Sequence, residues 1–165
     1  MIRLLRLDER LIHGQVAIKW SRHLNVSRIL VLNDEAAEND LIKKSLLMAA
    51  PPEIKVAIEK IDAGIQMLND PRAVSLNILV LVKTPQDVLK LLKSIEGIRS
   101  LNIGNYGRVA PNDSTGPRKM YRSNLYLYDS EIKVLQQILD TGIECVYQVT
   151  PEDKPESVKK ILEKN

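Results

Sequence analysis

Short apolar runs alternate with amphipathic stretches along the whole chain. The apolar runs predict strands at residues 2–7, 28–32, 54–58, 77–82, 100–103, 125–128 and 143–149. Between them, apolar residues recur close to every 3.6 positions and predict helices at 14–24, 38–50, 59–68, 84–97 and 129–140, with a charged helix from about 155. Such strict alternation of strand and helix is typical of parallel strands joined by right-handed crossovers.

The pattern therefore predicts the fold class α/β, with one domain over residues 1–165. We expect a single-domain, doubly wound, mainly parallel sheet of about seven strands with helices on both faces. Local signals mark several helix ends. Thr84 and Pro85 supply the hydroxyl cap and the first-turn proline of a helix start, and Pro51-Pro52 ends the predicted helix 38–50.

Composition sets limits on the class of protein. The chain has 165 residues, of which 44% are hydrophobic and 27% charged, an ordinary balance for a globular protein. No apolar run reaches the length of a membrane span, and Met1 leads into a strand without a signal-peptide pattern, so we expect a cytoplasmic location. The single cysteine, Cys145, excludes an internal disulfide and a cysteine-based metal cluster, and its apolar neighbours predict a buried strand residue.

The loop between the first strand and the first helix is the main candidate site. It contains Asp8, Arg10 and His13 and is followed by Gly14 and Gln15 at the predicted helix start. Ligands of open α/β sheets bind at loops that follow strands, and a helix N-terminus favours anions through its free N–H groups and its dipole. This position predicts an anion-binding site.

The residue types in this loop favour phosphoryl transfer. A neutral imidazole such as His13 is a nucleophile, and the planar guanidinium of Arg10 suits phosphate oxygens. The N–H groups near Gly14 and Gln15 are further donors. Asp8 either orients the imidazole or restrains Arg10, and the sequence does not choose between these roles. For His13 alone, a loop histidine that satisfies nearby backbone groups is the simpler interpretation, and its neighbours argue against it.

Other polar features are less specific. Asp34 follows the second strand. Two roles are compatible with this position: a turn residue, or a contact to phosphate or substrate. Residues 1–28 carry a net charge of +4 and residues 104–124 a net charge of +3, within a chain of +3 overall. If the two segments meet, they form a basic patch around His13. The long loop 104–122 is of a length that is usually functional or disordered.

Several other chemistries lack their motifs. The chain has no Gly-x-x-x-x-Gly-Lys-Ser/Thr loop, no Gly-x-Gly-x-x-Gly fingerprint and no Gly-x-Ser-x-Gly elbow. The hypothesis of a nucleotide-binding enzyme therefore rests on fold analogy alone, and it ranks last among the functions considered. Two separated histidines, His13 and His23, make no zinc site, and His23 is expected at an exposed helix end. We predict no metal, no cofactor and no nucleic-acid partner.

The run Arg6 to Val16, RLDERLIHGQV, resembles the signature of enzyme IIB subunits in the mannose/fructose/sorbose family of the bacterial phosphotransferase system. The similarity continues through Trp20 and through residues 31–34, 46–51, 102–104 and 142–144. It therefore spans nearly the whole chain. Around residues 105–107 and in the basic segment 118–122 the sequence departs from the family pattern. The position of Cys145 within a strand argues against the cysteine-phosphorylated IIB classes.

This resemblance implies a function. His13 would take a phosphoryl group from the phosphohistidine of a IIA protein and pass it to a hexose that arrives through the IIC and IID membrane subunits. Arg10 would stabilise the phosphate and Asp8 would be the orienting group. Membrane association would occur only through partners, and a homo-oligomer stays open. The alternative is a regulatory module of the same fold, whose His13 loop binds an anion without transfer to sugar.

Overall fold

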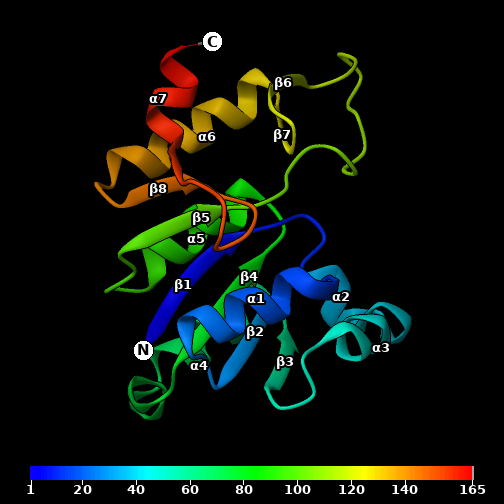
Figure 1. Ribbon diagram of the computed structural model, residues 1–165, viewed down its shortest axis with the longest axis vertical. Coiled ribbons are helices and arrows are strands. Elements are labelled where there is room, and N and C mark those ends of the chain that lie inside the picture. Colours follow the sequence, from blue (N-terminus) through cyan, green and yellow to red (C-terminus); the bar gives the residue numbers. More distant parts are fainter. Residues whose placement is uncertain (165) are drawn as a thin grey trace.

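A seven-stranded sheet forms the centre of the computed structural model, which describes residues 1–164 (Figure 1). Its strand order is β3-β2-β4-β1-β5-β8-β9, and only the last pair, β8 and β9, is antiparallel. The strands are β1 (Ile2–Leu7), β2 (Arg28–Leu32), β3 (Lys55–Glu59), β4 (Ile78–Val82), β5 (Ser100–Ile103), β8 (Glu144–Tyr147) and β9 (Glu156–Ser157). This arrangement confirms the predicted doubly wound, mainly parallel sheet.

Helices cover both faces of the sheet. One face packs against α1 (Gly14–Leu24), α2 (Asp34–Glu38) and α3 (Asp40–Ala49). The other packs against α4 (Ile61–Asn69), α5 (Pro85–Ser94), α6 (Asp129–Asp140) and α7 (Val158–Glu163), and a 3-10 turn spans Pro71–Ser75. Successive strand residues alternate between the two cores because side chains of a strand point to opposite faces. Within residues 1–164, no helix is both long and apolar enough to span a membrane.

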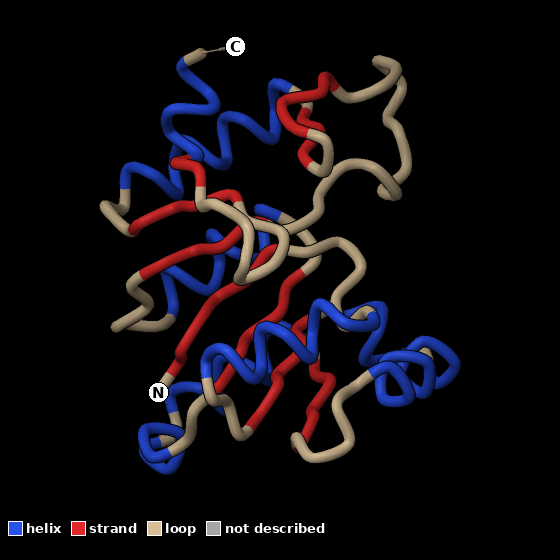
Figure 2. The backbone as a smooth tube through the Cα atoms, viewed as in Figure 1, coloured by secondary structure: helices blue, strands red, loops and turns tan. Residues whose placement is uncertain are grey.

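Two strand predictions need correction. The apolar segment 125–128 forms β7 (Leu125–Leu127), but it pairs with β6 (Lys119–Arg122) in a separate antiparallel hairpin and does not join the main sheet (Figure 2). The seventh strand of the sheet is instead the two-residue β9. Apolar composition alone does not distinguish a central strand from a hairpin strand whose apolar side faces a neighbouring helix.

Helix ends follow local hydrogen bonding. The predicted helix 38–50 is α3, which begins after Asn39 because that side chain accepts hydrogen bonds from the N–H groups of Leu41 and Ile42. The short helix α2 before it was not predicted. Thr84 caps α5 as predicted, since its hydroxyl accepts from the Asp87 N–H at 3.2 Å. The last helix begins at Val158, later than predicted, after β9.

The strand order places a topological switch point beside β1. After β1 the chain moves toward β2 and β3, and after β4 it crosses to β5 on the other side of β1. Ligands of doubly wound sheets bind outside the carboxyl ends of strands at such a point. The loops that start here are residues 8–13 and 104–118. The segment between β8 and β9 lies across the same part of the sheet (Figure 1).

Candidate active site

His13 stands at the start of α1. It is the N-cap residue, with extended backbone angles (φ −144°, ψ 120°), and its side chain makes no capping hydrogen bond. Gly14 follows with a φ of +45°, in the left-handed region that glycine adopts without a steric penalty. Gly14 and Gln15 are exposed, and no acidic residue lies in the first turn. The free N–H groups of the helix start are therefore available to an anion.

The His13 ring is poorly satisfied in the unliganded protein. Its side chain is 21% exposed, yet both ring nitrogens are buried and neither has a hydrogen-bond partner. The exposed part is therefore ring carbon. Burial lowers the pKa of His13 below 6.5; Asp8 and the Leu11 backbone oppose this change, whereas Arg10 and Arg6 add to it. The imidazole is thus neutral at neutral pH, which is the form that acts as a nucleophile.

Asp8 is completely buried and holds the loop together. Its Oδ2 accepts hydrogen bonds from Arg6 Nη2 at 2.9 Å and from Asn105 Nδ2 at 3.2 Å. Its Oδ1 accepts from the backbone N–H of Arg10 at 3.2 Å and lies 3.9 Å from His13 Nδ1. Asp8 therefore restrains the backbone at Arg10, and its carboxylate faces the imidazole without a hydrogen bond.

Arg10 presents its side chain to solvent. The residue is exposed, and its guanidinium forms no hydrogen bond or ion pair within residues 1–164. The guanidinium is nevertheless one of the charges that act on the His13 ring. The structure thus brings Asp8, Arg10 and His13 together, as the sequence predicts, with one buried anion, one exposed cation and one neutral ring.

Arg6 is a site residue that the sequence interpretation missed. It lies in β1, is 2% exposed, and its guanidinium points to the same face of the sheet as α1. It hydrogen-bonds Asp8, the Asn102 side chain and the carbonyl oxygens of Gln148 and Val149. One signal in the sequence was available: Arg6 is a charged residue at the second-last position of an apolar strand. A charged side chain is buried in an apolar core only when it has a partner.

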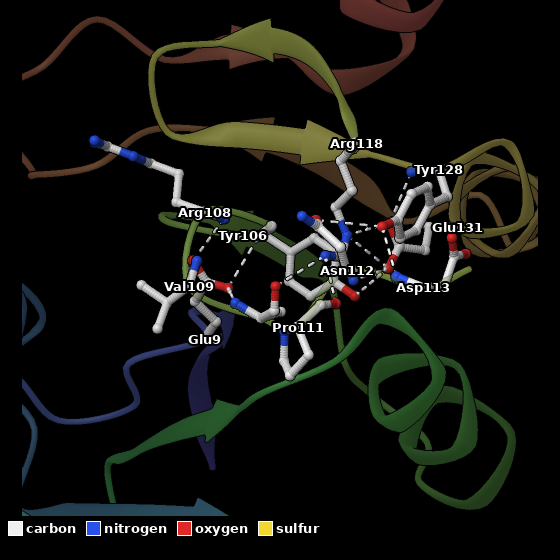
Figure 3. Close-up of polar contacts among 12 residues, drawn as sticks. Glu9, Tyr106, Arg108, Val109, Pro111, Asn112, Asp113, Arg118, Tyr128 and Glu131 are labelled. Carbon is white, nitrogen blue, oxygen red and sulfur yellow. Dashed lines mark hydrogen bonds and ion pairs between the residues drawn. The ribbon is translucent and has the colours of Figure 1, made fainter. Parts of the chain in front are cut away.

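Glu9 is a second missed residue (Figure 3). Its buried carboxylate accepts four backbone hydrogen bonds of 2.9 to 3.1 Å from the N–H groups of residues 107–110. Its own N–H donates to the carbonyl oxygen of Asn105 at 2.9 Å. The His13 loop and the long loop are therefore joined through adjacent residues, because Asp8 contacts Asn105 as well. Consecutive backbone N–H groups form a concave anion site of this kind.

The far end of the long loop is fixed by Arg118 (Figure 3). Its guanidinium pairs with Glu131 at 3.0 Å, lies over the Tyr128 ring and donates to the carbonyl oxygens of Ala110 and Pro111. The Tyr106 hydroxyl donates to Glu131 at 2.7 Å, and burial together with Glu131 raises the pKa of Tyr106 well above 10. Residues 104–118 are thus an ordered loop that lies beside the site.

The predicted basic patch is smaller than the sequence suggests. The two basic segments do meet, but three of their cations pair with carboxylates: Arg6 with Asp8, Arg118 with Glu131 and Arg122 with Glu156. Arg10 and Arg108 are exposed, and the Arg108 guanidinium donates to the Asn124 side chain. The positive charge that faces solvent near the site therefore comes mainly from these two residues.

Asp34 has a structural contact. Its Oδ1 accepts from the N–H of Ile61 at 2.9 Å, at the start of α4, and its charge acts on Lys60, Asp87 and Lys90. It is not among the charged groups that act on His13. A contact from Asp34 to phosphate or substrate stays a prediction. Within residues 1–164, no group of three His, Cys, Asp or Glu side chains is placed to hold a metal ion.

The other two candidate nucleophiles have ordinary structural positions. Cys145 is buried in β8 as predicted, and burial raises the pKa of its thiol to about 12. A thiol with so high a pKa is a poor nucleophile, because the thiolate is the reactive form. His23 is exposed near the end of α1, and its ring packs edge-on against Trp20 at 5.9 Å. His13 is therefore the histidine that combines burial, neighbouring charges and a helix start.

Comparison with known proteins supports one family. Residues 2–165 match the model of the phosphotransferase system sorbose subfamily IIB component. The chain is 34% identical over 152 residues to a probable phosphotransferase enzyme IIB component of Streptococcus pyogenes serotype M6, covering 92% of this chain and 93% of that protein. It is 38% identical over 104 residues to the mannose-specific EIIAB component of Escherichia coli K12, covering 63% of this chain and 32% of that longer protein.

A solved structure agrees over the full length. The crystal structure of the IIB domain of the sorbose permease from Klebsiella pneumoniae superimposes with a TM-score of 0.90 at 26% identity, over 100% of this chain and 98% of that one. Sequence and fold thus point to the same group, whose members are phosphotransferases that take phosphate from IIA and pass it to sugar. The chain belongs to the sorbose subfamily of IIB components of the phosphotransferase system.

Proposed function

We propose that His13 is the phosphoacceptor, which takes a phosphoryl group from the phosphohistidine of a IIA protein and passes it to a hexose delivered by IIC and IID membrane subunits. The observation that carries this proposal is the His13 ring itself. It sits at the N-terminus of α1 with two unpartnered nitrogens, and burial lowers its pKa. A neutral imidazole beside free N–H groups is suited to attack phosphorus.

The transfer consists of two displacements at phosphorus. In the first, the lone pair of a His13 ring nitrogen forms a new nitrogen–phosphorus bond while the bond to the donor histidine breaks, and the donor imidazole leaves. In the second, a hexose hydroxyl oxygen bonds to the same phosphorus while the nitrogen–phosphorus bond to His13 breaks, and the hydroxyl proton passes to the departing imidazole. Both steps need alignment and charge stabilisation more than covalent assistance.

Neighbouring groups supply that stabilisation in the proposal. The exposed Arg10 guanidinium is free to contact two phosphate oxygens at once. The first-turn N–H groups at Gly14 and Gln15 add donors. Asp8 fixes the backbone at Arg10 and so positions both cation and ring. We propose this set as the residues that handle phosphate, with Asp34 as a predicted additional contact.

The partners follow from the family. The EIIAB component of Escherichia coli carries, by its name, both an A and a B part, which supports a IIA donor for this chain. We propose that the protein works in the cytoplasm and reaches the membrane only through the IIC and IID subunits. The proposal does not specify which hexose is phosphorylated.

Intact mass spectrometry tests the proposal. Purified protein is incubated with phosphoenolpyruvate, the general phosphocarrier proteins and a cognate IIA, as wild type, His13→Ala and His23→Ala. We expect one acid-labile addition of about 80 Da on wild type and on His23→Ala, and none on His13→Ala. Circular dichroism should show that His13→Ala keeps the fold, because a loop site contributes little to the core. Phosphate on His13→Ala would refute the assignment.

A second step separates the regulatory alternative. The isolated phosphoprotein is mixed with membranes that contain IIC and IID and with a panel of hexoses. Release of sugar phosphate supports the phosphotransferase. A phosphoprotein that forms on His13 but is not discharged by any hexose would instead identify the regulatory module.

A further inference from the structure

Arg6 is buried, and both terminal nitrogens of its guanidinium have partners. Its Nη2 donates to Asp8 Oδ2 at 2.9 Å and to the carbonyl oxygen of Val149 at 3.0 Å. Its Nη1 donates to the carbonyl oxygen of Gln148 at 3.1 Å and to the Asn102 side chain. The carbon at the centre of the guanidinium lies 5.3 Å from the centre of the Trp20 ring. A buried cation needs such compensation, because burial of an unpaired charge is costly.

The surrounding backbone leaves room for this guanidinium. Gly104 follows β5, and a Cβ atom added there would overlap the Arg6 guanidinium at its Nη2 and Cζ atoms. The Trp20 indole N–H donates to the carbonyl oxygen of Val149 at 3.0 Å, so α1 is tied to the same group of contacts. The first strand, the first helix and the segment after β8 therefore meet at Arg6.

Arg6 and Asp8 form the closest ion pair to His13. The two side chains are 2% and 0% exposed, and the second oxygen of Asp8 lies 3.9 Å from His13 Nδ1. A buried carboxylate at this distance from an imidazole normally favours the protonated ring. Asp8 instead makes three hydrogen bonds, to Arg6, to Asn105 and to the backbone of Arg10, and none to His13.

We propose that Arg6 is a positioning residue that neutralises Asp8 and keeps its carboxylate from hydrogen-bonding His13, so that the ring stays unprotonated and ready to attack phosphorus. The charged groups that act on His13 are one anion, Asp8, and two cations, Arg10 and Arg6. Without Arg6, the buried carboxylate has only the exposed Arg10 and the imidazole itself as cationic neighbours. The inference rests on the proposed role of His13 as phosphoacceptor.

Titration of His13 by NMR on the unphosphorylated protein tests this role. In Arg6→Gln, which keeps hydrogen-bond donors and removes the charge, the pKa of His13 should rise by about one to three units. In Arg6→Lys, which keeps the charge, it should remain within about half a unit of wild type. In the double variant Arg6→Gln/Asp8→Asn, which removes both charges, it should return toward the wild-type value. His23 is the internal control and should not change.

These variants separate charge compensation from support of the fold. A merely structural Arg6 would give equal effects in Arg6→Lys and Arg6→Gln, with no recovery in the double variant, and an unchanged His13 pKa in folded Arg6→Gln would overturn the proposal. If Arg6 variants do not fold, Asp8→Asn alone decides. The pKa of His13 should fall there, because the charge of Arg6 is no longer compensated by the Asp8 carboxylate, and a pKa that stays constant or rises would refute the inference.

The titration also distinguishes this inference from the proposed function. The pKa of His13 is measured without any phosphate donor, so it does not depend on phosphoryl transfer. In a second experiment, the rate of phosphorylation by IIA is measured against pH. The acid limb of the rate profile in Arg6→Gln should move to higher pH by the same amount as the His13 pKa. A shifted pKa without phosphorylation would refute the role of His13 and leave the role of Arg6 intact.

Discussion

At the scale of single residues, the charged groups of the site differ in burial and in pairing. Asp8 and Arg6 are fully buried and Arg6 donates a hydrogen bond to Asp8, whereas Arg10 is exposed and unpaired within the described chain. His13 lies 3.9 Å from Asp8, and neither of its ring nitrogens has a hydrogen-bond partner. Unpartnered buried polar atoms are rare in folded proteins and are often found where function requires them. A phosphoryl group would provide the missing partner for a His13 ring nitrogen and for the N–H groups of the Arg10 guanidinium.

Substitution of Arg10 tests its part in transfer. Arg10→Ala should slow phosphorylation of His13 by IIA roughly 100-fold, as expected for loss of one charge-stabilising donor set. Arg10→Lys should be intermediate, because a point charge does not reproduce the planar fork. Rapid-quench phosphorylation measures both rates. Arg22→Ala is the matched control, since Arg22 is exposed on α1 and its side chain forms no hydrogen bond among residues 1–164. An unchanged rate in Arg10→Ala would remove Arg10 from the mechanism.

At the scale of elements, the long loop is held to the His13 loop by one carboxylate. Glu9 accepts four backbone hydrogen bonds from residues 107–110. Hydrogen bonds to a charged group contribute roughly 1.5 to 3 kcal/mol each, and burial of the carboxylate makes them costly to lose. Residues that are adjacent in sequence, Asp8 and Glu9, thus connect the His13 loop to two different parts of the neighbouring loop.

Removal of this carboxylate should loosen the loop. In Glu9→Ala, amide hydrogen exchange of residues 107–110 should accelerate more than tenfold, because loss of about 1.4 kcal/mol already corresponds to a factor of ten. Exchange in β2 and β3 should not change. Glu96→Ala is the control, because Glu96 is exposed and its carboxylate accepts no hydrogen bond from the described part of the chain. Equal protection of residues 107–110 in Glu9→Ala and wild type would show that the loop is ordered by other contacts.

The sequence predicted helices and strands well where a local pattern of residues is enough to define them. Ile78–Val82 is buried on both sides and reads as a central strand, and Thr84 with Pro85 marks the next helix start. Leu125–Leu127 has similar apolar character, but its pairing with β6 depends on the course of a long loop that composition does not encode. The two-residue β9 has no strand signal, because its place is fixed by pairing with β8.

Asp8, Arg10 and His13 could be proposed from the sequence alone, whereas the buried contacts of Arg6 and Glu9 could not. Asp8, Arg10 and His13 are polar residues in a loop after a strand, so position and residue type identify them. Arg6 and Glu9 do their work through contacts with β5, the segment after β8 and the long loop, which are about 95 to 143 residues distant in sequence. Pairing over such distances is a property of the folded chain. The charge of Arg6 within a buried strand was the one local indication.

At the scale of the whole molecule, the lowered pKa of His13 links stability to pH. Burial is its main cause, so the unfolded chain, where the pKa is near 6.5, binds more protons than the folded protein. The His13 contribution is therefore favourable above about pH 6.5 and is lost as pH falls toward the folded-state pKa. Each unit of the difference corresponds to about 1.4 kcal/mol.

Urea unfolding at several pH values measures this linkage. The free energy of unfolding of wild type should fall as pH is lowered from 7 toward 5, and His13→Ala should lose part of that dependence. His23→Ala, which removes the exposed histidine, should retain it. A wild-type pH dependence that is identical in His13→Ala would contradict a neutral, partly buried His13.

The central claim is that His13 carries the phosphoryl group, and NMR of histidine nitrogens tests it most directly. Protein labelled with ¹⁵N-histidine is phosphorylated through phosphoenolpyruvate, the general phosphocarriers and a cognate IIA, and the two imidazole spin systems are followed. We predict that one ring nitrogen of His13 shows coupling to ³¹P and that the His23 resonances keep their positions. Coupling at His23, or an unmodified His13 in a protein whose mass has increased by one phosphate, would contradict the assignment.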